Sequence, residues 1–254
     1  MKLHVLGSGT AIPLNYRASP SLAVQIDGHL ILLDIGPGTL RQLARIGLNH
    51  EGIERIFLTH FHPDHTADLV HFLFATKNPS TVRSRAPFSI NGARGLTGFI
   101  ARLQAAYGQW LTPPPGIMTL EEFNVGETTE RDYPEFRLIA GPTDHTPASL
   151  AYRLENRSGK SIVYSGDTGY CDTIIELARG ADLLVLEASF PDGKEVVGHL
   201  TPSQAGRIAA LAGVELLMLI HFYPECLESD ITEQCRRHYR GELILGSDLL
   251  EIRF

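Results

Sequence analysis

The sequence predicts a mixed α/β fold in which two similar sheets pack face to face with helices outside. Short apolar or alternating runs bounded by Gly, Pro and Asp are typical of strands in a mixed sheet. Strand patterns followed by helical patterns occur in both halves of the chain, which favours two sheets of similar construction. The 254 residues, 43% hydrophobic, are enough to bury a sizeable core. We expect one domain spanning residues 1–254.

The first half of the chain is expected to alternate strands with helices. Its predicted strands cover residues 3–6, 22–26, 30–34, 54–58 and 88–93. Its predicted helices cover residues 38–46, 66–75 and 95–107. Polar residues with Pro and Ser indicate a loop over 77–87. Three consecutive prolines indicate an extended connection over 111–118.

The second half repeats this alternation, and several of its strands run into polar residues. Its predicted strands cover residues 136–145, 149–156, 161–167, 183–190, 216–222 and 242–245. Its predicted helices cover residues 172–179, 202–212 and 229–239. Thr201 is expected to cap the second of these helices, with Pro202 at its first position.

Charge and cysteine content narrow the class of protein. A formal net charge of -7 argues against a broadly basic surface for non-specific nucleic-acid binding. The basic residues nearest the first histidine motif are Lys77, Arg83 and Arg85, which we expect on a solvated surface loop.

The three cysteines, Cys171, Cys226 and Cys235, have no Cys-x-x-Cys spacing and are expected to be reduced thiols. Without a long apolar run or a signal-peptide pattern, the sequence predicts a cytoplasmic protein with no membrane partner.

The stretch FLTHFHPDHTADL carries His60, His62, Asp64 and His65 within six positions. The first two histidines alternate at the end of a predicted strand, so their imidazoles are expected on the same side. The intervening proline ends that strand and turns the next two residues back. A lone histidine is usually structural, but burying several imidazoles without a metal or a partner is costly. The cluster therefore predicts metal ligands.

Further ligand-type residues follow later apolar strands. These residues are His145 in GPTDHTPAS, Asp167 in YSGDTG and His221 in LLMLIHFYP. With the first cluster they make five histidines and two carboxylates, a set that suits two Zn²⁺ ions, with Mn²⁺ or Fe²⁺ as alternatives. Asp167 is the candidate to bridge the two ions.

These residues, in this order, resemble the metallo-beta-lactamase superfamily of binuclear hydrolases. The segments LGSGTAIP, LLDIGPGT, VYSGDT, ADLLVLEASF and GHLTPSQAGRIAALAGVELLMLIHF are similar to its ribonuclease Z branch, and the likeness runs from about residue 3 to 225. The resemblance implies an αββα sandwich of two mixed sheets, with the metals at one edge. It also implies a homodimer, although no stretch of the sequence identifies the interface.

The same resemblance implies a ligand scheme. One metal would lie on His60, His62 and His145, the second on Asp64, His65 and His221, with Asp167 shared. Asp34, in LLDIGPG, would be a carboxylate that contacts a ligand from outside the centre and fixes its orientation, because metal-bound imidazoles need such partners.

The implied reaction is hydrolysis of a phosphodiester. Two neighbouring dications lower the pKa of a bridging water and stabilise charge during in-line displacement. In the resembled branch, the residue matching His199 faces the scissile phosphate and protonates the leaving oxygen or stabilises its charge. Glu187 would orient and polarise that histidine. Asp64 is counted with these two residues as catalytic as well as a ligand.

Residue identity distinguishes this pattern from several other chemistries. Gly7 and Gly9 follow a strand as in a dinucleotide fold, but a third glycine is absent and Pro13 lies where the helix should begin. Oxygen-reducing flavodiiron members have glutamate at the position of His62, and zinc beta-lactamases commonly have cysteine at that of Asp167. Lactone and thioester hydrolases share all seven ligands and remain alternatives, as does a non-catalytic metal-binding module.

Two departures from the transfer-RNA 3′-processing enzymes bear on the substrate. The interval from His145 to Asp167 is 22 residues, enough for a hairpin but not for the arm that grips RNA in many of those enzymes. Pro37 lies where they usually have glutamate. We therefore expect a small phosphodiester substrate, with cleavage at an RNA 3′ end as the alternative.

Overall fold

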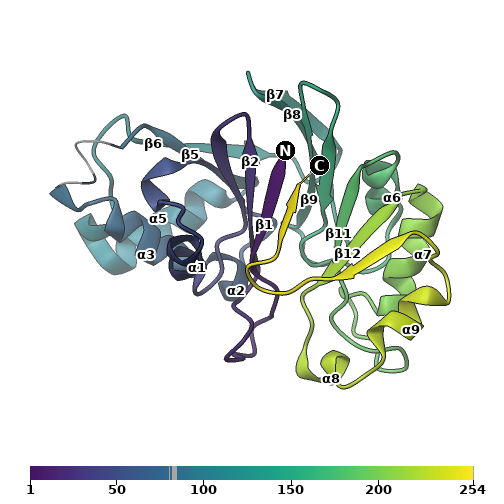
Figure 1. The fold of residues 1–254 in the computed structure, drawn as a ribbon. Helices are drawn as coiled ribbons and strands as arrows, with labels where there is room; N and C mark the ends of the chain where they lie inside the picture. The colour runs from purple at the N-terminus through teal and green to yellow at the C-terminus, as the bar shows by residue number, and fades with distance from the viewer. Residues whose placement is uncertain (80, 82–84, 254) are drawn as a thin grey trace.

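The computed structural model describes residues 1–79, 81 and 85–253, and within them it contains two seven-stranded sheets. The sheets pack against each other with helices on their outer sides, which confirms the predicted αββα sandwich (Figure 1). Helices α1, α3 and α5 cover one outer side, and α6, α7 and α9 cover the other. Among the described residues, none of the helices has the length and apolar content to cross a bilayer.

The first sheet has the strand order β14-β1-β2-β3-β4-β5-β6. Its strands are β1 (Lys2–Gly7), β2 (Ser21–Ile26), β3 (His29–Leu33), β4 (Ile53–Phe57), β5 (Phe88–Ala93), β6 (Met118–Phe123) and β14 (Glu251–Arg253). Strands β1, β2, β3 and β14 pair antiparallel, whereas β3 through β6 pair parallel. The pairing of β1 with β14 brings the two chain termini together (Figure 1).

The second sheet repeats this construction with the order β13-β12-β11-β10-β9-β8-β7. Its strands are β7 (Thr129–Asp132), β8 (Phe136–Pro142), β9 (Leu150–Asn156), β10 (Ser161–Tyr164), β11 (Leu183–Glu187), β12 (Leu216–Ile220) and β13 (Glu242–Leu245). Strands β7 to β10 are antiparallel and β10 to β13 are parallel. The carboxyl ends of parallel strands share one edge of a sheet, which is where ligand-type residues follow them.

The six predicted helices are present with bounds within three residues of those expected, and the short helices α2 and α8 were not predicted. They are α1 (Thr39–Arg45), α2 (Pro63–Thr66), α3 (Asp68–Ala75), α5 (Leu96–Tyr107), α6 (Asp172–Ala178), α7 (Pro202–Ala212), α8 (Pro224–Leu227) and α9 (Ile231–Arg236), with 3₁₀ turns η1 (His50–Gly52) and η2 (Gly108–Leu111). Thr201 caps α7 as expected. It accepts from the main-chain N–H of Gln204, whose side chain accepts in return from Thr201 N–H.

Three apolar layers hold the sandwich together. The central layer lies between the sheets and includes Leu3, Val24, Phe57, Tyr152 and Val185, all inaccessible to solvent. Two further clusters lie between each sheet and its helices. Burial of both faces explains why the inner strands read as nearly continuous apolar runs in the sequence.

Some sequence predictions were wrong or incomplete. Strands β6, β7 and β14 were not expected. All three lie at sheet edges, and β7 and β14 carry mostly polar residues, whereas β6 is half apolar. The connection predicted over 111–118 covers fewer residues than expected, because Leu111 is the last residue of η2 and Met118 is the first residue of β6. The loop predicted over 77–87 includes helical positions at Pro79 and Thr81, while residues 80 and 82–84 lie outside the described residues.

The prediction that Arg85 lies on a solvated surface loop was also wrong. The residue is 6% exposed, and its guanidinium donates to the carbonyls of His50 and Ile53 and lies over the rings of Phe72 and Phe88. Burial lowers the pKa of Arg85 to about 10. Arg85 therefore connects η1 and β4 with α3 and β5. Lys77 donates to the carbonyl of Thr112; Arg83 lies outside the described residues.

Candidate metal centre

The first histidine cluster lies just beyond the end of β4. The strand ends at Phe57, earlier than predicted, and residues 58–62 carry His60 and His62 in non-strand backbone. The proline at 63 opens the short helix α2, whose first turn presents Asp64 and His65. A proline is well suited to a first helical position because its missing N–H would have no partner there. The chain turns at the predicted position, but it turns into a helix.

The remaining candidates also lie in loops after strands. His145 follows β8, Asp167 follows β10 and His221 follows β12, each one to three residues beyond the strand. The structure gathers the seven residues into two groups whose ligand atoms lie within 4.8 Å of one another. The groups are His60, His62, His145 and Asp167, and Asp64, His65 and His221. They match the two halves of the ligand scheme that the resemblance implies.

Asp167 lies between the two groups. Its Oδ1 is 3.2 Å from His65 Nε2 and 3.3 Å from His221 Nε2. Its Oδ2 is 3.8 Å from His60 Nε2 and 3.7 Å from His145 Nε2. Each carboxylate oxygen therefore faces one group, which is the arrangement that a bridging ligand requires.

Buried atoms without partners test whether these residues suit a metal. Within the described part of the chain, Nε2 of His60, His65 and His221 and Oδ1 of Asp167 are buried and form no hydrogen bond. Leaving such atoms unsatisfied is expensive, and most buried polar atoms find a partner. Imidazole nitrogens and carboxylate oxygens are ligands of zinc-type ions. The residues therefore fit a metal centre.

The other ring nitrogens are held from outside the centre. Nδ1 of His65 bonds Asp34 Oδ2 at 2.7 Å, and Nδ1 of His221 bonds Ser189 Oγ at 2.8 Å. Thr59 Oγ1 lies 3.0 Å from Nδ1 of His60, and the carbonyl of Gly198 lies 2.9 Å from Nδ1 of His145. Such contacts fix the ring orientation and leave Nε2 of His60, His65 and His221 free for a metal, whereas Nε2 of His145 lies 3.2 Å from Nδ1 of His62.

Asp34 lies at the centre of its own hydrogen-bond network. Besides His65, its buried carboxylate accepts from Thr59 N–H at 2.7 Å, from Thr59 Oγ1 and from Tyr164 Oη at 2.9 Å. Asp34 and His221 both have left-handed backbone, with φ of 60° and 61°. Non-glycine residues adopt this conformation rarely, and such strain concentrates at functional sites.

Burial and neighbouring charge shift the titration of the cluster. Burial, reinforced by nearby His65, lowers the pKa of His60 strongly. Burial opposes a charge on His65, but Asp167 and Asp34 outweigh it and raise the pKa of His65. Burial likewise opposes a charge on Asp167, yet His221 and His65 hold its pKa well below the usual range. The protein thus keeps Asp167 ionised, as a metal ligand must be.

His199 and Glu187 form a separate pair beside the ligands. Nδ1 of His199 lies 3.0 Å from Oε1 of Glu187, whose side chain is almost completely buried. Burial opposes a positive charge on His199, but the hydrogen bond and the charge of Glu187 outweigh it and raise the pKa of His199. The His199 ring lies 4.9 Å from that of His145, and His199 groups with Asp167 and His221. The His199 ring is therefore next to the candidate ligands.

Several supporting residues were not predicted from the sequence. Thr59, Tyr164, Ser189 and the carbonyl of Gly198 each contact a candidate ligand or Asp34. Thr59 directly precedes His60 and Gly198 directly precedes His199, so proximity to the motifs was the available signal. Tyr164 and Ser189 also lie close to Asp167 and Glu187 in the sequence, but their partners Asp34 and His221 lie far away in the chain.

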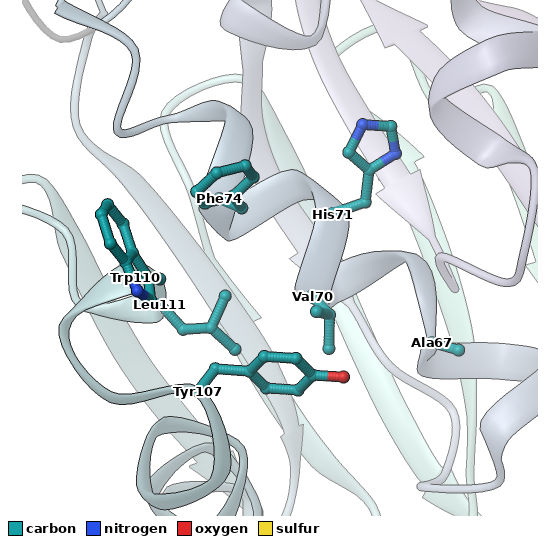
Figure 2. A pocket seen from close by; sticks show the side chains of 7 residues that line it. All are labelled: Ala67, Val70, His71, Phe74, Tyr107, Trp110 and Leu111. Carbon is teal, nitrogen blue, oxygen red and sulfur yellow. The ribbon is translucent and has the colours of Figure 1, made fainter.

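An apolar hollow of about 580 Å³ lies elsewhere, between α3, α5 and η2 (Figure 2). Its lining residues are Ala67, Val70, His71, Phe74, Tyr107, Trp110 and Leu111. None of the candidate ligands lines this hollow, and its surface offers few polar groups. The chemistry therefore belongs to the histidine and aspartate centre.

Comparison with known proteins agrees with this geometry. Residues 29–222 match the family described as Beta-lactamase superfamily domain. A Ribonuclease Z of Mycobacterium sp. (strain KMS) is 31% identical, and the match covers 98% of this chain and 94% of that protein. Human tRNase Z, short form, has a TM-score of 0.82 at 25% identity, covering 100% of this chain and 99% of that chain. The metallo-beta-lactamase fold protein YhfI of Bacillus subtilis has a TM-score of 0.84 at 22% identity, covering 99% and 98%, and shows likeness of fold.

The matched range, residues 29–222, covers more than half of the chain and includes every candidate ligand as well as His199 and Glu187. The chain therefore belongs to the beta-lactamase superfamily, in its ribonuclease Z-like branch, and is a metal-dependent hydrolase as its histidine and aspartate pattern predicted.

Proposed function

We propose that the protein is a binuclear, zinc-dependent phosphodiesterase. The observation that carries this proposal is the position of Asp167, whose two oxygens face the two groups of ligands separately. One ion would be held by His60, His62 and His145, the other by Asp64, His65 and His221, with Asp167 shared. When bound, such ions lower the pKa of water and neutralise charge that develops on a phosphoryl oxygen.

The proposed role of His199 is to donate a proton to the leaving oxygen or stabilise its charge. Its support is the Glu187 contact, which raises the pKa of His199 and so favours the protonated ring. Glu187 also accepts from Thr168 N–H at 2.8 Å and from the hydroxyl of Ser189. These bonds fix the carboxylate, and through it the ring, relative to the ligands. We retain Asp64 as a catalytic carboxylate in addition to its proposed role as a ligand.

We favour a small phosphodiester as the substrate. Between His145 and Asp167 the chain forms the antiparallel pair β9 and β10, joined by residues 157–160, so the predicted short hairpin occupies this interval. The second candidate is an RNA 3′ end, as in transfer-RNA 3′ processing, and the identity to proteins named Ribonuclease Z supports it.

A single panel of substrates separates these candidates. The purified protein is loaded with Zn²⁺ and assayed with bis(p-nitrophenyl) phosphate, a cyclic nucleotide, a precursor transfer RNA and an acyl-homoserine lactone. We expect about two metal ions per chain by elemental analysis and the highest kcat/KM on a small phosphodiester. A higher kcat/KM on precursor transfer RNA would make the second candidate correct.

The same panel tests the remaining alternatives. Turnover of the lactone alone, or of a thioester in a parallel assay, would replace the phosphodiesterase by an acyl hydrolase. Two bound ions without turnover of any of these compounds would indicate a non-catalytic metal-binding module.

We also propose a cytoplasmic homodimer. All three cysteines are free, which supports a reducing compartment. The dimer is proposed by resemblance to the family, and sedimentation of the purified protein tests it.

A further inference from the structure

The left-handed backbone of His221 is held by the N-terminal loop, residues 8–20 between β1 and β2. His221 has φ of 61°, and its main-chain N–H donates to the carbonyl of Ser8 at 2.9 Å. A left-handed, non-glycine residue persists only where the surrounding structure holds it. The side chain of His221 takes its direction from this backbone, so the position of Ser8 affects where Nε2 points.

Ser8 is itself fixed by the carboxylate of Asp248. Oδ1 of Asp248 accepts from Ser8 N–H at 3.0 Å and from Ser8 Oγ at 2.7 Å, although the two residues are 240 positions apart. Ser8 is fully buried. Arg17 donates to Ser8 Oγ at 2.6 Å and to the carbonyl of Gly246 at 2.7 Å, which closes the connection from the other side.

The second oxygen of Asp248 anchors two more elements. Oδ2 accepts from Ala18 N–H at 2.7 Å and from Gln42 Nε2, on α1, at 2.6 Å. One carboxylate thus receives four hydrogen bonds, from both ends of the N-terminal loop and from the first helix. Bonds to a charged acceptor are stronger than those between neutral groups. Asp248 therefore determines the position of the Ser8 carbonyl.

Among the described residues, the hydrogen bonds from Asp248 through Ser8 lead directly to one of the two ligand groups. His221 belongs to the group with Asp64 and His65, whereas the outer contacts of His60 and His145 are Thr59 and Gly198. We propose that Asp248 is a positioning residue for His221 and thereby controls the affinity of this second group for its metal ion. The proposal rests on the metal centre put forward above.

The test replaces Asp248 by asparagine. One carboxylate oxygen then becomes an amide nitrogen, which cannot accept the hydrogen bonds that Ser8, or Ala18 and Gln42, donate at that position. Zn²⁺ content is measured by elemental analysis, and the two dissociation constants by competition with a chromogenic chelator. We expect one ion to bind about tenfold more weakly, as outer partners of ligands commonly contribute this much, and the other ion to be unaffected. Excess Zn²⁺ should restore most of the turnover of bis(p-nitrophenyl) phosphate, because Asp248 has no contact with the reacting groups.

Asp182→Asn is a matched control. Asp182 also accepts from a serine N–H and from the same serine's hydroxyl, both of Ser161, and from Lys160. Its partners have no hydrogen bond to a candidate ligand among the described residues. We expect unchanged Zn²⁺ affinities in this variant. Equal weakening in Asp182→Asn and Asp248→Asn would overturn the proposal, since the effect would then be general loss of stability.

Ser8→Ala is the milder second variant, and it decides the question if Asp248→Asn lacks a cooperative melting transition. It removes the hydroxyl bonds to Asp248 and Arg17 but keeps the carbonyl that His221 uses. We expect a smaller loss of affinity at the same single site. Wild-type affinities in the folded variants would overturn the positioning role alone, whereas fewer than two ions on the unaltered protein would overturn the metal centre itself.

Discussion

Asp34 and His65 are joined by a 2.7 Å hydrogen bond, and both side chains are completely buried. This contact leaves Nε2 of His65 without a partner inside the candidate centre. Asp34→Asn should therefore weaken binding of the ion at His65 by about 10- to 100-fold. Asparagine tolerates left-handed backbone as aspartate does, so the turn should persist. Chelator competition measures the change.

Asp68→Asn is the control for this prediction. Asp68 accepts from Leu40 N–H and thereby connects α3 with α1, but it does not contact a candidate ligand. Its substitution should leave metal affinity unchanged. Wild-type affinity in Asp34→Asn would show that His65 does not need its aspartate partner.

His199→Ala should reduce kcat on bis(p-nitrophenyl) phosphate by about 10²- to 10⁴-fold, the range typical of a lost general acid. The metal content should stay at the wild-type value, because the proposed role is toward the leaving group. His71→Ala is the control, since the His71 side chain is 65% exposed on α3. Full activity of His199→Ala would remove the leaving-group role, and loss of metal would make His199 a ligand instead.

Removal of metal should lower thermal stability. A ligand at 100 times its dissociation constant stabilises the folded state by about 2.7 kcal/mol. For a chain of this size that corresponds to a fall in Tm of about 5 to 10 °C after chelation. Differential scanning calorimetry before and after chelation, and again after Zn²⁺ is restored, measures the shift. An identical Tm in all three samples would contradict the centre.

Gly36→Ala should be destabilising because a Cβ at this position would lie 2.0 Å from the carbonyl oxygen of Asp64. The backbone carrying a candidate ligand would have to move, at a cost of about 1 to 3 kcal/mol. Gly52→Ala is the control, since a Cβ there has no neighbour within 4 Å. Urea titration of the two variants should show a lower midpoint for the first substitution only.

Thiol reactivity should divide the three cysteines. Burial raises the pKa of Cys226 to about 12 and that of Cys235 to about 11, so little thiolate is present near pH 8. Titration of the native protein with a chromogenic disulfide reagent should show at most one fast thiol, and three after denaturation. Fast reaction of all three thiols in the native state would contradict this burial.

The sequence was sufficient to predict the sandwich and the close grouping of the seven candidate ligands. Inner strands such as β2 and β11 are buried along almost their whole length, so their apolar runs identified them. Edge strand β7, with the sequence TERD, has no apolar residue, and its conformation comes from pairing with β8. A pattern based on burial cannot detect such a strand.

The parts of the site that escaped prediction are the contacts made across long sequence separations. Ser189 bonds His221 and Tyr164 bonds Asp34, yet neither residue type is unusual at the end of a strand. The connection from Asp248 to Ser8 joins opposite ends of the chain. The prediction for Arg85 failed because a charged residue in a polar stretch is usually solvated. In the structure Arg85 is buried, and its guanidinium lies over two phenylalanine rings.

Both ligand groups depend on residues from the second half of the chain, with consequences for biosynthesis. The segment after β4 supplies His60, His62, Asp64 and His65, but neither group is complete without Asp167 or His221. During translation the second group must wait for His221, and Asp248, the positioning residue that we propose for it, follows 27 positions later. A ribosome-bound fragment that stops before His145 would thus carry an open cluster of imidazoles.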